Sequence, residues 1–223
     1  MRKQVWLTVM MIVLATSGLA LVGWQVRGIL QGQAAGEVQG VPQPLVGVLL
    51  PTPRELRPFT LRDHEGKAVD QERLRGKWHF FFFGYTHCPD VCPLSMSHLA
   101  EVFALLKKTP RALDGVQGWF VTVDPQRDTV EHLKAYLPYF HPDLLGVTGT
   151  ESDILSFSKQ LGAYYSVGPT PDSGAPPLIS HSAVFFVVDP EGRFAALFQP
   201  QLHPPEVMAG LFVKMRQHYG ELP

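Results

Sequence analysis

Residues 78–93 read WHFFFFGYTHCPDVCP, and this stretch decides the fold. Its first part, Trp78–Phe83, is a nearly unbroken apolar and aromatic run of strand length, which is typical of a strand buried on both faces of a sheet. After Pro93 the apolar residues recur at helical spacing, at Leu99, Val102, Phe103 and Leu106. The stretch therefore predicts a buried strand followed at once by a helix, with Cys88 and Cys92 at the junction.

Patterns on both sides of this stretch predict the remaining elements of an α/β domain. Before it, residues 56–61 and 67–69 indicate a short hairpin whose turn uses Gly66. After it come a strand at 118–123, a helix at 128–140, a strand at 144–148, a helix at 150–161, a hairpin of 183–188 with 194–198, and a helix at 205–215. A proline-rich loop, Ser166–Ser180, leads into the late hairpin. This order predicts a thioredoxin-like α/β fold with an N-terminal hairpin and insertions.

Composition excludes several classes of protein. The 223 residues carry 19 Lys plus Arg against 20 Asp plus Glu without a cationic run, so no nucleic-acid partner is expected. Two cysteines cannot build a disulfide scaffold. With 45% hydrophobic residues the chain can bury a sizeable core, which excludes wholesale disorder. Function must therefore reside in a few residues of one globular domain.

The N-terminal residues predict export and attachment to a membrane. Arg2 and Lys3 precede an uncharged stretch, residues 4–26, which at about 1.5 Å per residue can span a hydrocarbon core of about 30 Å. A secretory signal cut near residues 18–20 is the alternative. The basic N-terminus favours a single-pass protein of the inner (cytoplasmic) membrane with its domain on the periplasmic side.

These features divide the chain into three parts. Residues 1–27 are predicted to be a membrane anchor or signal peptide. Residues 28–53 are rich in Gly, Gln and Pro and lack any helical or strand period, which is typical of a flexible linker. Residues 54–223 are predicted to form the thioredoxin-like domain.

The spacing of Cys88 and Cys92 favours metal binding over a disulfide. A helix N-terminus stabilises thiolate, which is the form that binds metal and attacks disulfides, so both thiols are expected to ionise more readily than free cysteine. Four residues apart on a helix, their Cβ atoms would lie roughly 5–6 Å apart. A disulfide needs about 3.8 Å, whereas one soft metal ion fits between the two sulfurs with little strain. An inert disulfide and thiol redox chemistry remain alternatives.

A third ligand is sought among the histidines, because two thiolates leave a coordination sphere incomplete. His79 lies inside the buried strand and is expected to be a core residue, and the side chain of His87 is expected to point away from that of Cys88. His181 stands where the proline-rich loop enters the late hairpin, a place that can face the strand-to-helix junction. The histidines expected on solvated helix faces are His98, His132 and His218.

The segment Gly84–Pro93, GYTHCPDVCP, resembles the signature of the Sco/SenC family of copper chaperones. Further similarity lies at Arg75–Lys77, at Val123–Thr129 and at the late histidine, and together it extends over residues 54–218. The resemblance implies a thioredoxin-like domain, attached to a membrane, that binds one copper ion. The residues that match the ligands of the family are Cys88, Cys92 and His181.

The resemblance also implies a function and partners. Such a protein delivers copper to the dinuclear copper centre of cytochrome c oxidase, and its partners are the copper-receiving subunit of a respiratory oxidase and a copper donor or thiol reductant. The alternative within the family is a thiol–disulfide oxidoreductase that reduces the cysteines of the copper-receiving protein. One departure concerns metal affinity: Ser180 precedes His181, where family members often have Asp.

The chemistry of the candidate ligands agrees with copper, as Cu(I) or Cu(II). Two thiolates and one imidazole are soft to borderline ligands, whereas structural zinc normally takes a fourth ligand. A copper carrier is not an enzyme. The enzymatic alternatives are an oxidoreductase, with Cys88 as the attacking and Cys92 as the resolving thiol, and a thiol peroxidase.

Overall fold

The computed structural model describes residues 40–169 and 176–223. The helices and strands in chain order are β1 (Leu49–Glu55), β2 (Leu61–Asp63), β3 (Ala68–Val69), α2 (Gln71–Leu74), β4 (Trp78–Gly84), α3 (Val91–Leu106), β5 (Val116–Thr122), α4 (Val130–Tyr136), the 3-10 helix η1 (Leu137–Tyr139), β6 (Leu144–Thr148), α5 (Glu151–Leu161), β7 (Tyr165–Val167), β8 (Ile179–His181), β9 (Phe185–Val188), β10 (Arg193–Phe198) and α6 (Pro205–His218).

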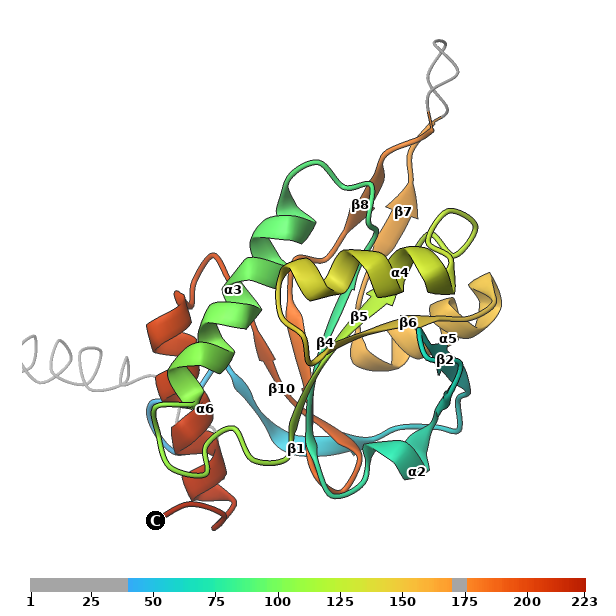
Figure 1. Ribbon diagram of the computed structural model, residues 1–223. Coiled ribbons are helices and arrows are strands. Elements are labelled where there is room, and N and C mark those ends of the chain that lie inside the picture. The colour runs from blue at the N-terminus through green and yellow to red at the C-terminus, as the bar shows by residue number, and fades with distance from the viewer. Residues whose placement is uncertain (1–39, 170–175) are drawn as a thin grey trace, which may run out of the picture. The chain divides into compact units, whose positions relative to one another are not determined.

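An eight-stranded sheet in the order β1-β10-β9-β4-β5-β6-β2-β3 forms the centre of the domain (Figure 1). Strands β4, β5 and β6 run parallel, because α3 and α4 connect them as crossover helices. The pairs β4 with β9, β9 with β10, β10 with β1 and β2 with β6 are antiparallel. The mixed sheet with this order of helices agrees with the predicted thioredoxin-like fold.

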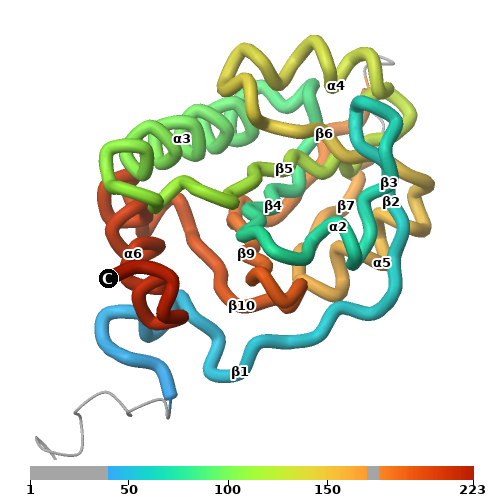
Figure 2. The backbone as a smooth tube through the Cα atoms, turned by 60° about the horizontal axis from the view of Figure 1, so that its bottom comes forward, coloured from blue at the N-terminus to red at the C-terminus, as the bar shows by residue number. Residues whose placement is uncertain are grey.

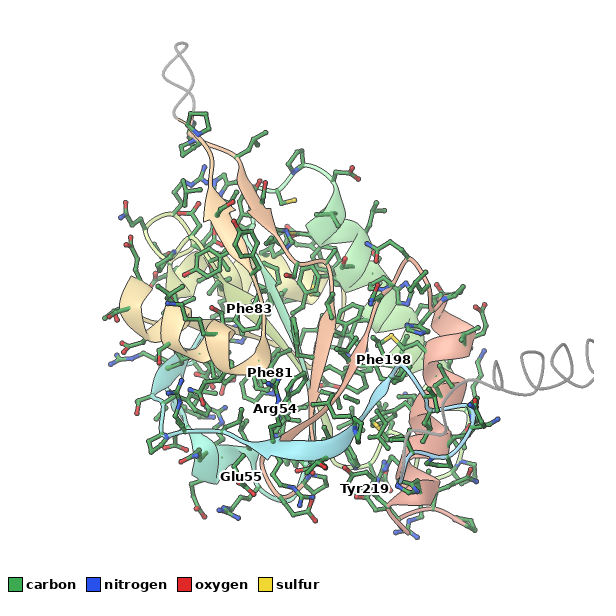
Figure 3. The ribbon with its side chains drawn as sticks, turned by 180° about the vertical axis from the view of Figure 1, so that it is seen from behind. Arg54, Glu55, Phe81, Phe83, Phe198 and Tyr219 are labelled. Carbon is green, nitrogen blue, oxygen red and sulfur yellow. The ribbon has the colours of Figure 1, made fainter. Side chains whose placement is uncertain are left out.

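Strand β4 is the core of the sheet, and all seven of its residues are buried. On one face the ring of Phe80 contacts Phe212 of α6, with 4.9 Å between the ring centroids. On the other face Phe81 and Phe83 contact Phe157 of α5 (Figure 3). Helices α3, α4 and α6 cover the first face and α5 the second (Figure 2). Coverage of both faces explains why the strand reads as an unbroken apolar run.

Local sequence signals place several elements as expected. The predicted strand 144–148 is β6. In the hairpin of β2 and β3, Gly66 has a φ of +83°, which a residue with a side chain rarely adopts. The side chains of Thr129 and Thr150 cap α4 and α5. Helix α5 ends at Gly162 in the left-handed conformation.

Three segments differ from the expected positions. Strand β1 begins at Leu49, within the predicted linker. The sequence did not reveal it because an edge strand with two prolines and mostly exposed side chains lacks the apolar alternation of a buried strand. Its Arg54 lies over the ring of Phe194 on β10 (Figure 3). Helix α3 begins at Val91, two residues before Pro93. The predicted loop Ser166–Ser180 contains most of the β7–β8 hairpin.

The transmembrane helix that the sequence predicted in residues 1–27 is not supported, and the fold class is corrected accordingly. Those residues lie outside the described part of the chain. Within residues 40–169 and 176–223 no helix is long and apolar enough to cross a membrane. Helix α3 has 16 residues and rises about 24 Å, less than a hydrocarbon core of about 30 Å.

Candidate metal centre

The structure brings the three predicted ligands, Cys88, Cys92 and His181, together at the carboxyl end of β4. Their sulfur and nitrogen atoms all lie within 4.8 Å of one another. The Sγ of Cys92 is 3.1 Å from Nε2 of His181, although the two residues are 89 positions apart in the chain. The close approach arises because the β7–β8 hairpin stands beside the N-terminal end of α3 (Figure 1).

The two cysteines occupy different local structures. Cys88 lies in the turn before α3, where its backbone N–H donates to the carbonyl of Tyr85 at 3.2 Å. Cys92 lies in the first turn of α3 and is fully buried. The helix starts after Cys88, so the i, i+4 helical geometry assumed from the sequence does not apply to this pair. Both side chains are free thiols.

Gly84, the last residue of β4, leaves the space that the thiol of Cys92 occupies. A Cβ at this position would lie 2.8 Å from Cys92 Sγ and 3.0 Å from the rings of Phe82 and Phe120. A Cβ atom 2.8 Å from a sulfur would overlap it sterically, so a side chain at this position would force the thiol or the strand to move. The glycine therefore allows the sulfur to lie directly against the end of the central strand.

His181 is held in place by its strand and by two aromatic rings. It pairs with Tyr165 across the β7–β8 hairpin. Its ring meets Phe82 edge-on at 5.6 Å and Tyr85 edge-on at 6.1 Å between centroids. Its Nδ1 lies 3.4 Å from the carbonyl oxygen of Ser182, a long hydrogen bond. This packing directs Nε2 towards the sulfur of Cys92.

Burial sets the protonation of the centre. Desolvation raises the pKa of the Cys92 thiol well above its ordinary value, so the expectation that both cysteines ionise readily is wrong for Cys92. Full burial outweighs the favourable effect of the helix terminus there. Desolvation also lowers the pKa of His181, which favours the neutral imidazole that metals bind. A metal ion must therefore displace the proton of Cys92.

The arrangement fits one soft metal ion with little rearrangement. Donor atoms bound to the same ion at about 2.0–2.3 Å can be no more than about 4.6 Å apart. The three donor atoms here, all within 4.8 Å of one another, are close to that limit. Two sulfurs and one imidazole nitrogen would leave one position of a four-coordinate ion open.

The turn that carries Cys88 is fixed by Asp128, the first residue of the predicted helix 128–140. Asp128 is fully buried. It accepts a 3.0 Å hydrogen bond from the backbone N–H of Thr86 and a 2.6 Å bond from the hydroxyl of Thr122. The cap of α4 is instead the neighbouring Thr129. The positioning role of Asp128 depends on contacts between β4 and β5, for which no local sequence signal exists.

The other candidate residues lie away from the three donors or make structural contacts. His79 is a buried core residue, as predicted. His87 is exposed and lies beside Asp128. Asp90 stands at the N-cap of α3 without a capping hydrogen bond from its side chain. Ser180 is exposed; its side chain points to the face of β8 opposite that of His181, because side chains alternate along a strand.

Comparisons with known proteins find one matching family model and several curated relatives. A family model described as SCO1/SenC matches residues 50–216. The protein SCO2 homolog, mitochondrial, from Bos taurus is 40% identical over 136 residues, which cover 61% of this chain and 50% of the relative. The protein SCO1 homolog 1, mitochondrial, from Arabidopsis thaliana is 34% identical over 161 residues, which cover 72% and 47%. The chain thus spans about half the length of the curated relatives it matches.

Three solved structures of similar chains are described as copper-bound, among them those from Bradyrhizobium japonicum and yeast. The ScoI protein of Bradyrhizobium japonicum is 38% identical with a TM-score of 0.63, and the match covers 72% of this chain and 98% of that one. Yeast Sco1 is 32% identical with a TM-score of 0.67, and the match covers 74% and 90%.

The predicted localisation requires a correction. The sequence indicated a single-pass protein of the inner membrane with a periplasmic domain. The curated relatives are instead named as mitochondrial proteins. Residues 40–169 and 176–223 also contain no helix that could span a membrane. The single-pass, inner-membrane localisation is therefore not supported.

Proposed function

Since this chain belongs to the SCO1/SenC family, we propose that it is a copper-binding assembly protein of cytochrome c oxidase. In this proposal Cys88, Cys92 and His181 hold one copper ion and deliver it to the dinuclear copper centre of the oxidase. Copper is the cargo, and the copper-receiving subunit of the oxidase is the partner.

Copper as the bound metal agrees with the relatives, whose structures from Arabidopsis thaliana, Bradyrhizobium japonicum and yeast are described as having copper bound. The donor set supports the same metal. Thiolates are soft ligands that select copper in its Cu(I) state, and imidazole suits copper in both oxidation states.

The observation that carries the proposal is the convergence of the three donors. Cys92 Sγ and His181 Nε2 lie 3.1 Å apart although they come from different parts of the chain, and Cys88 completes a group within 4.8 Å. Gly84 leaves room for the sulfur at the end of β4. A buried thiol next to an imidazole with a lowered pKa favours binding of a soft cation over a purely structural role.

The same burial makes rapid thiol–disulfide exchange less favourable. Cys92, the resolving thiol of that reaction, would have to attack the mixed disulfide as a thiolate, but its raised pKa keeps the thiol protonated at neutral pH. Cys88 is only 9% exposed, which restricts the approach of a protein disulfide. Reduction of the cysteines of the copper-receiving protein is therefore the competing outcome of the test below.

The test is an anaerobic titration of the reduced full-length protein with Cu(I) in competition with a chelator of known affinity. We expect one copper per chain. Loss of a residue that only supports a metal ligand typically lowers metal affinity by about 10–100-fold, and we expect Cys88→Ser and Cys92→Ser, which each remove a ligand, to lower it by more than that. The control is His218→Ala, which changes an exposed histidine on α6.

Delivery is tested by mixing the copper-loaded protein with an apo fragment that carries a dinuclear copper site of an oxidase subunit. We expect copper to appear on the fragment, with free thiols retained on the carrier. If the wild-type protein fails to retain copper but rapidly reduces an oxidised fragment, the proposal is wrong and the oxidoreductase function replaces it.

A further inference from the structure

A second group of metal-ligating side chains lies next to the thiol centre. It consists of His87, Asp128 and His132, whose candidate donor atoms all lie within 4.8 Å of one another. His87 directly precedes Cys88 but takes no part in the Cys88, Cys92 and His181 group. The proposed copper carrier does not use the two histidines, so the cluster requires its own explanation.

Topology explains why these residues meet. His87 follows β4, whereas Asp128 and His132 follow β5. The two strands are parallel neighbours in the sheet. Because the carboxyl ends of parallel strands lie at the same edge, the segments that follow them lie side by side.

The carboxylate at the base of the cluster is buried and rigidly held. Asp128 has no exposed surface. Thr86 donates to it through its backbone N–H at 3.0 Å and its hydroxyl at 2.5 Å, and Thr122 donates through its hydroxyl at 2.6 Å. These donors are neutral, and Nδ1 of His87 lies 3.6 Å from the same carboxylate.

The two imidazoles lie next to this carboxylate and are exposed to solvent. Their rings are stacked, with centroids 5.3 Å apart and planes 10° from parallel. His87 and His132 are both exposed, so their rings can rotate without disturbing the core. Two imidazoles and one fixed negative charge at a solvent-facing position suit a cation that would be bound from solution.

We propose that His87, His132 and Asp128 form a second metal site, separate from the thiol centre, that takes Cu(II). Imidazole and carboxylate ligands are borderline to hard, and among divalent first-row metals Cu(II) binds such ligands most tightly. The carboxylate neutralises part of the charge of the ion, and water completes the coordination. The chain would thus carry a soft, thiol-based site and a harder, nitrogen and oxygen site on adjacent segments.

The test isolates this site by removing both thiols. Full-length protein with Cys88→Ser and Cys92→Ser is titrated with Cu(II) at about pH 7.5, where free imidazole is mostly neutral. Paramagnetic resonance spectra of the bound Cu(II) report nitrogen ligands through their hyperfine splitting. We expect one Cu(II) per chain with splitting from two nitrogens.

Further histidine substitutions in this background then identify the ligands. His132→Ala is expected to weaken Cu(II) binding by about tenfold or more and to remove one nitrogen from the spectrum. His218→Ala, a change of an exposed histidine on another helix, is the matched control and should alter neither. Circular dichroism of each variant checks that the fold is retained, and His132→Gln replaces His132→Ala if α4 is perturbed.

Two results would overturn the second site. One is Cu(II) affinity and nitrogen splitting that are the same in the His132→Ala and His218→Ala proteins. The other is loss of the signal in a His181→Ala protein but not in the His132→Ala protein, which would assign the metal to the remaining residue of the thiol centre. Neither result depends on whether the intact protein carries copper to an oxidase.

Discussion

Two histidines lie near opposite ends of strand β4, one within the strand and one packed against it, and their ring nitrogens have different partners. His79, near the amino end of the strand, is 1% exposed and has both nitrogens paired. Its Nε2 lies 2.9 Å from the carbonyl oxygen of Leu74, and its Nδ1 accepts a 2.7 Å bond from the indole of Trp119. His181, near the carboxyl end, places Nε2 3.1 Å from the sulfur of Cys92.

The difference shows what separates a structural histidine from a candidate ligand. The two hydrogen bonds of His79 fix one neutral tautomer and leave no nitrogen free for a metal. The Nε2 of His181 instead faces a thiol, whose proton a metal ion can replace. Both rings are enclosed by aromatic neighbours, so burial alone does not distinguish them.

Acidification should destabilise the fold through His79, whereas His181 is expected to matter chiefly for copper binding. Burial lowers the pKa of His79 from 6.5 to about 4. Above pH 6.5 neither the folded nor the unfolded form binds the proton, whereas between 6.5 and 4 only the unfolded form does, so the stability falls over that window. The loss amounts to about 3 kcal/mol. Urea unfolding of the metal-free protein between about pH 7 and pH 4 measures it.

The control for this prediction is His79→Gln, which retains a donor and an acceptor but does not titrate. Other histidines with lowered pKa values, His64, His181 and His203 among them, contribute to the same trend in both proteins. The wild-type protein should therefore lose about 3 kcal/mol more than the variant on acidification. Parallel stability curves for the two proteins would contradict the assignment.

Removal of each imidazole in turn should separate stability from copper binding. His181→Ala should weaken Cu(I) binding by about 100-fold, or about 2.7 kcal/mol. His79→Gln should instead lower the free energy of unfolding by about 1–3 kcal/mol, because Trp119 and Leu74 lose well-placed partners. Its copper affinity should stay within about threefold of the wild type. Chelator competition and urea unfolding provide the two measurements, and a large loss of copper affinity in His79→Gln would remove the distinction.

Gly84→Ala tests the space at the carboxyl end of β4. The new Cβ would lie 2.8 Å from Cys92 Sγ, so the sulfur must shift away from its present position. We expect Cu(I) affinity to fall by about tenfold and stability to fall by about 1–3 kcal/mol. The matched control is Gly210→Ala on α6, where no atom beyond the adjoining residues and backbone of its own helix lies within 4 Å of the added Cβ. Unchanged copper affinity in Gly84→Ala would mean that the sulfur is not confined by the strand.

Much of the fold could be predicted because its signals are local. The apolar run of β4, the Thr150 cap and the Gly162 terminus of α5 are each encoded within a few residues. Strand β1 escaped this reasoning because its residues are defined by pairing with β10 and not by their own pattern. Edge strands with prolines resemble linkers until their partner strand is known.

The residues of the candidate site could be predicted from the sequence, but their burial and hydrogen bonds could not. The motif and the family resemblance indicated Cys88, Cys92 and His181, which the structure brings together. The full burial of Cys92 depends on the packing of β4 against α3, which the sequence does not show. The predicted direction of the pKa shift of Cys92 was therefore wrong. Nor could the sequence show that Asp128 fixes the turn, because its hydrogen-bond partners, Thr86 and Thr122, lie at the ends of two different strands.

The smallest effect is expected for Ser180→Asp, which restores the residue that the family resemblance led us to expect before the candidate ligand. Ser180 is exposed, and its side chain points to the other face of β8 from His181 because side chains alternate along a strand. A carboxylate there would act on the metal only through solvent-screened charge. Copper affinity should therefore rise by no more than about threefold, and the increase should disappear at high salt. A larger, salt-independent increase would mean that the hairpin can turn this side chain into the site. His181 would then differ from His79 in two respects: its ring nitrogen faces a thiol, and the hairpin that carries it can move.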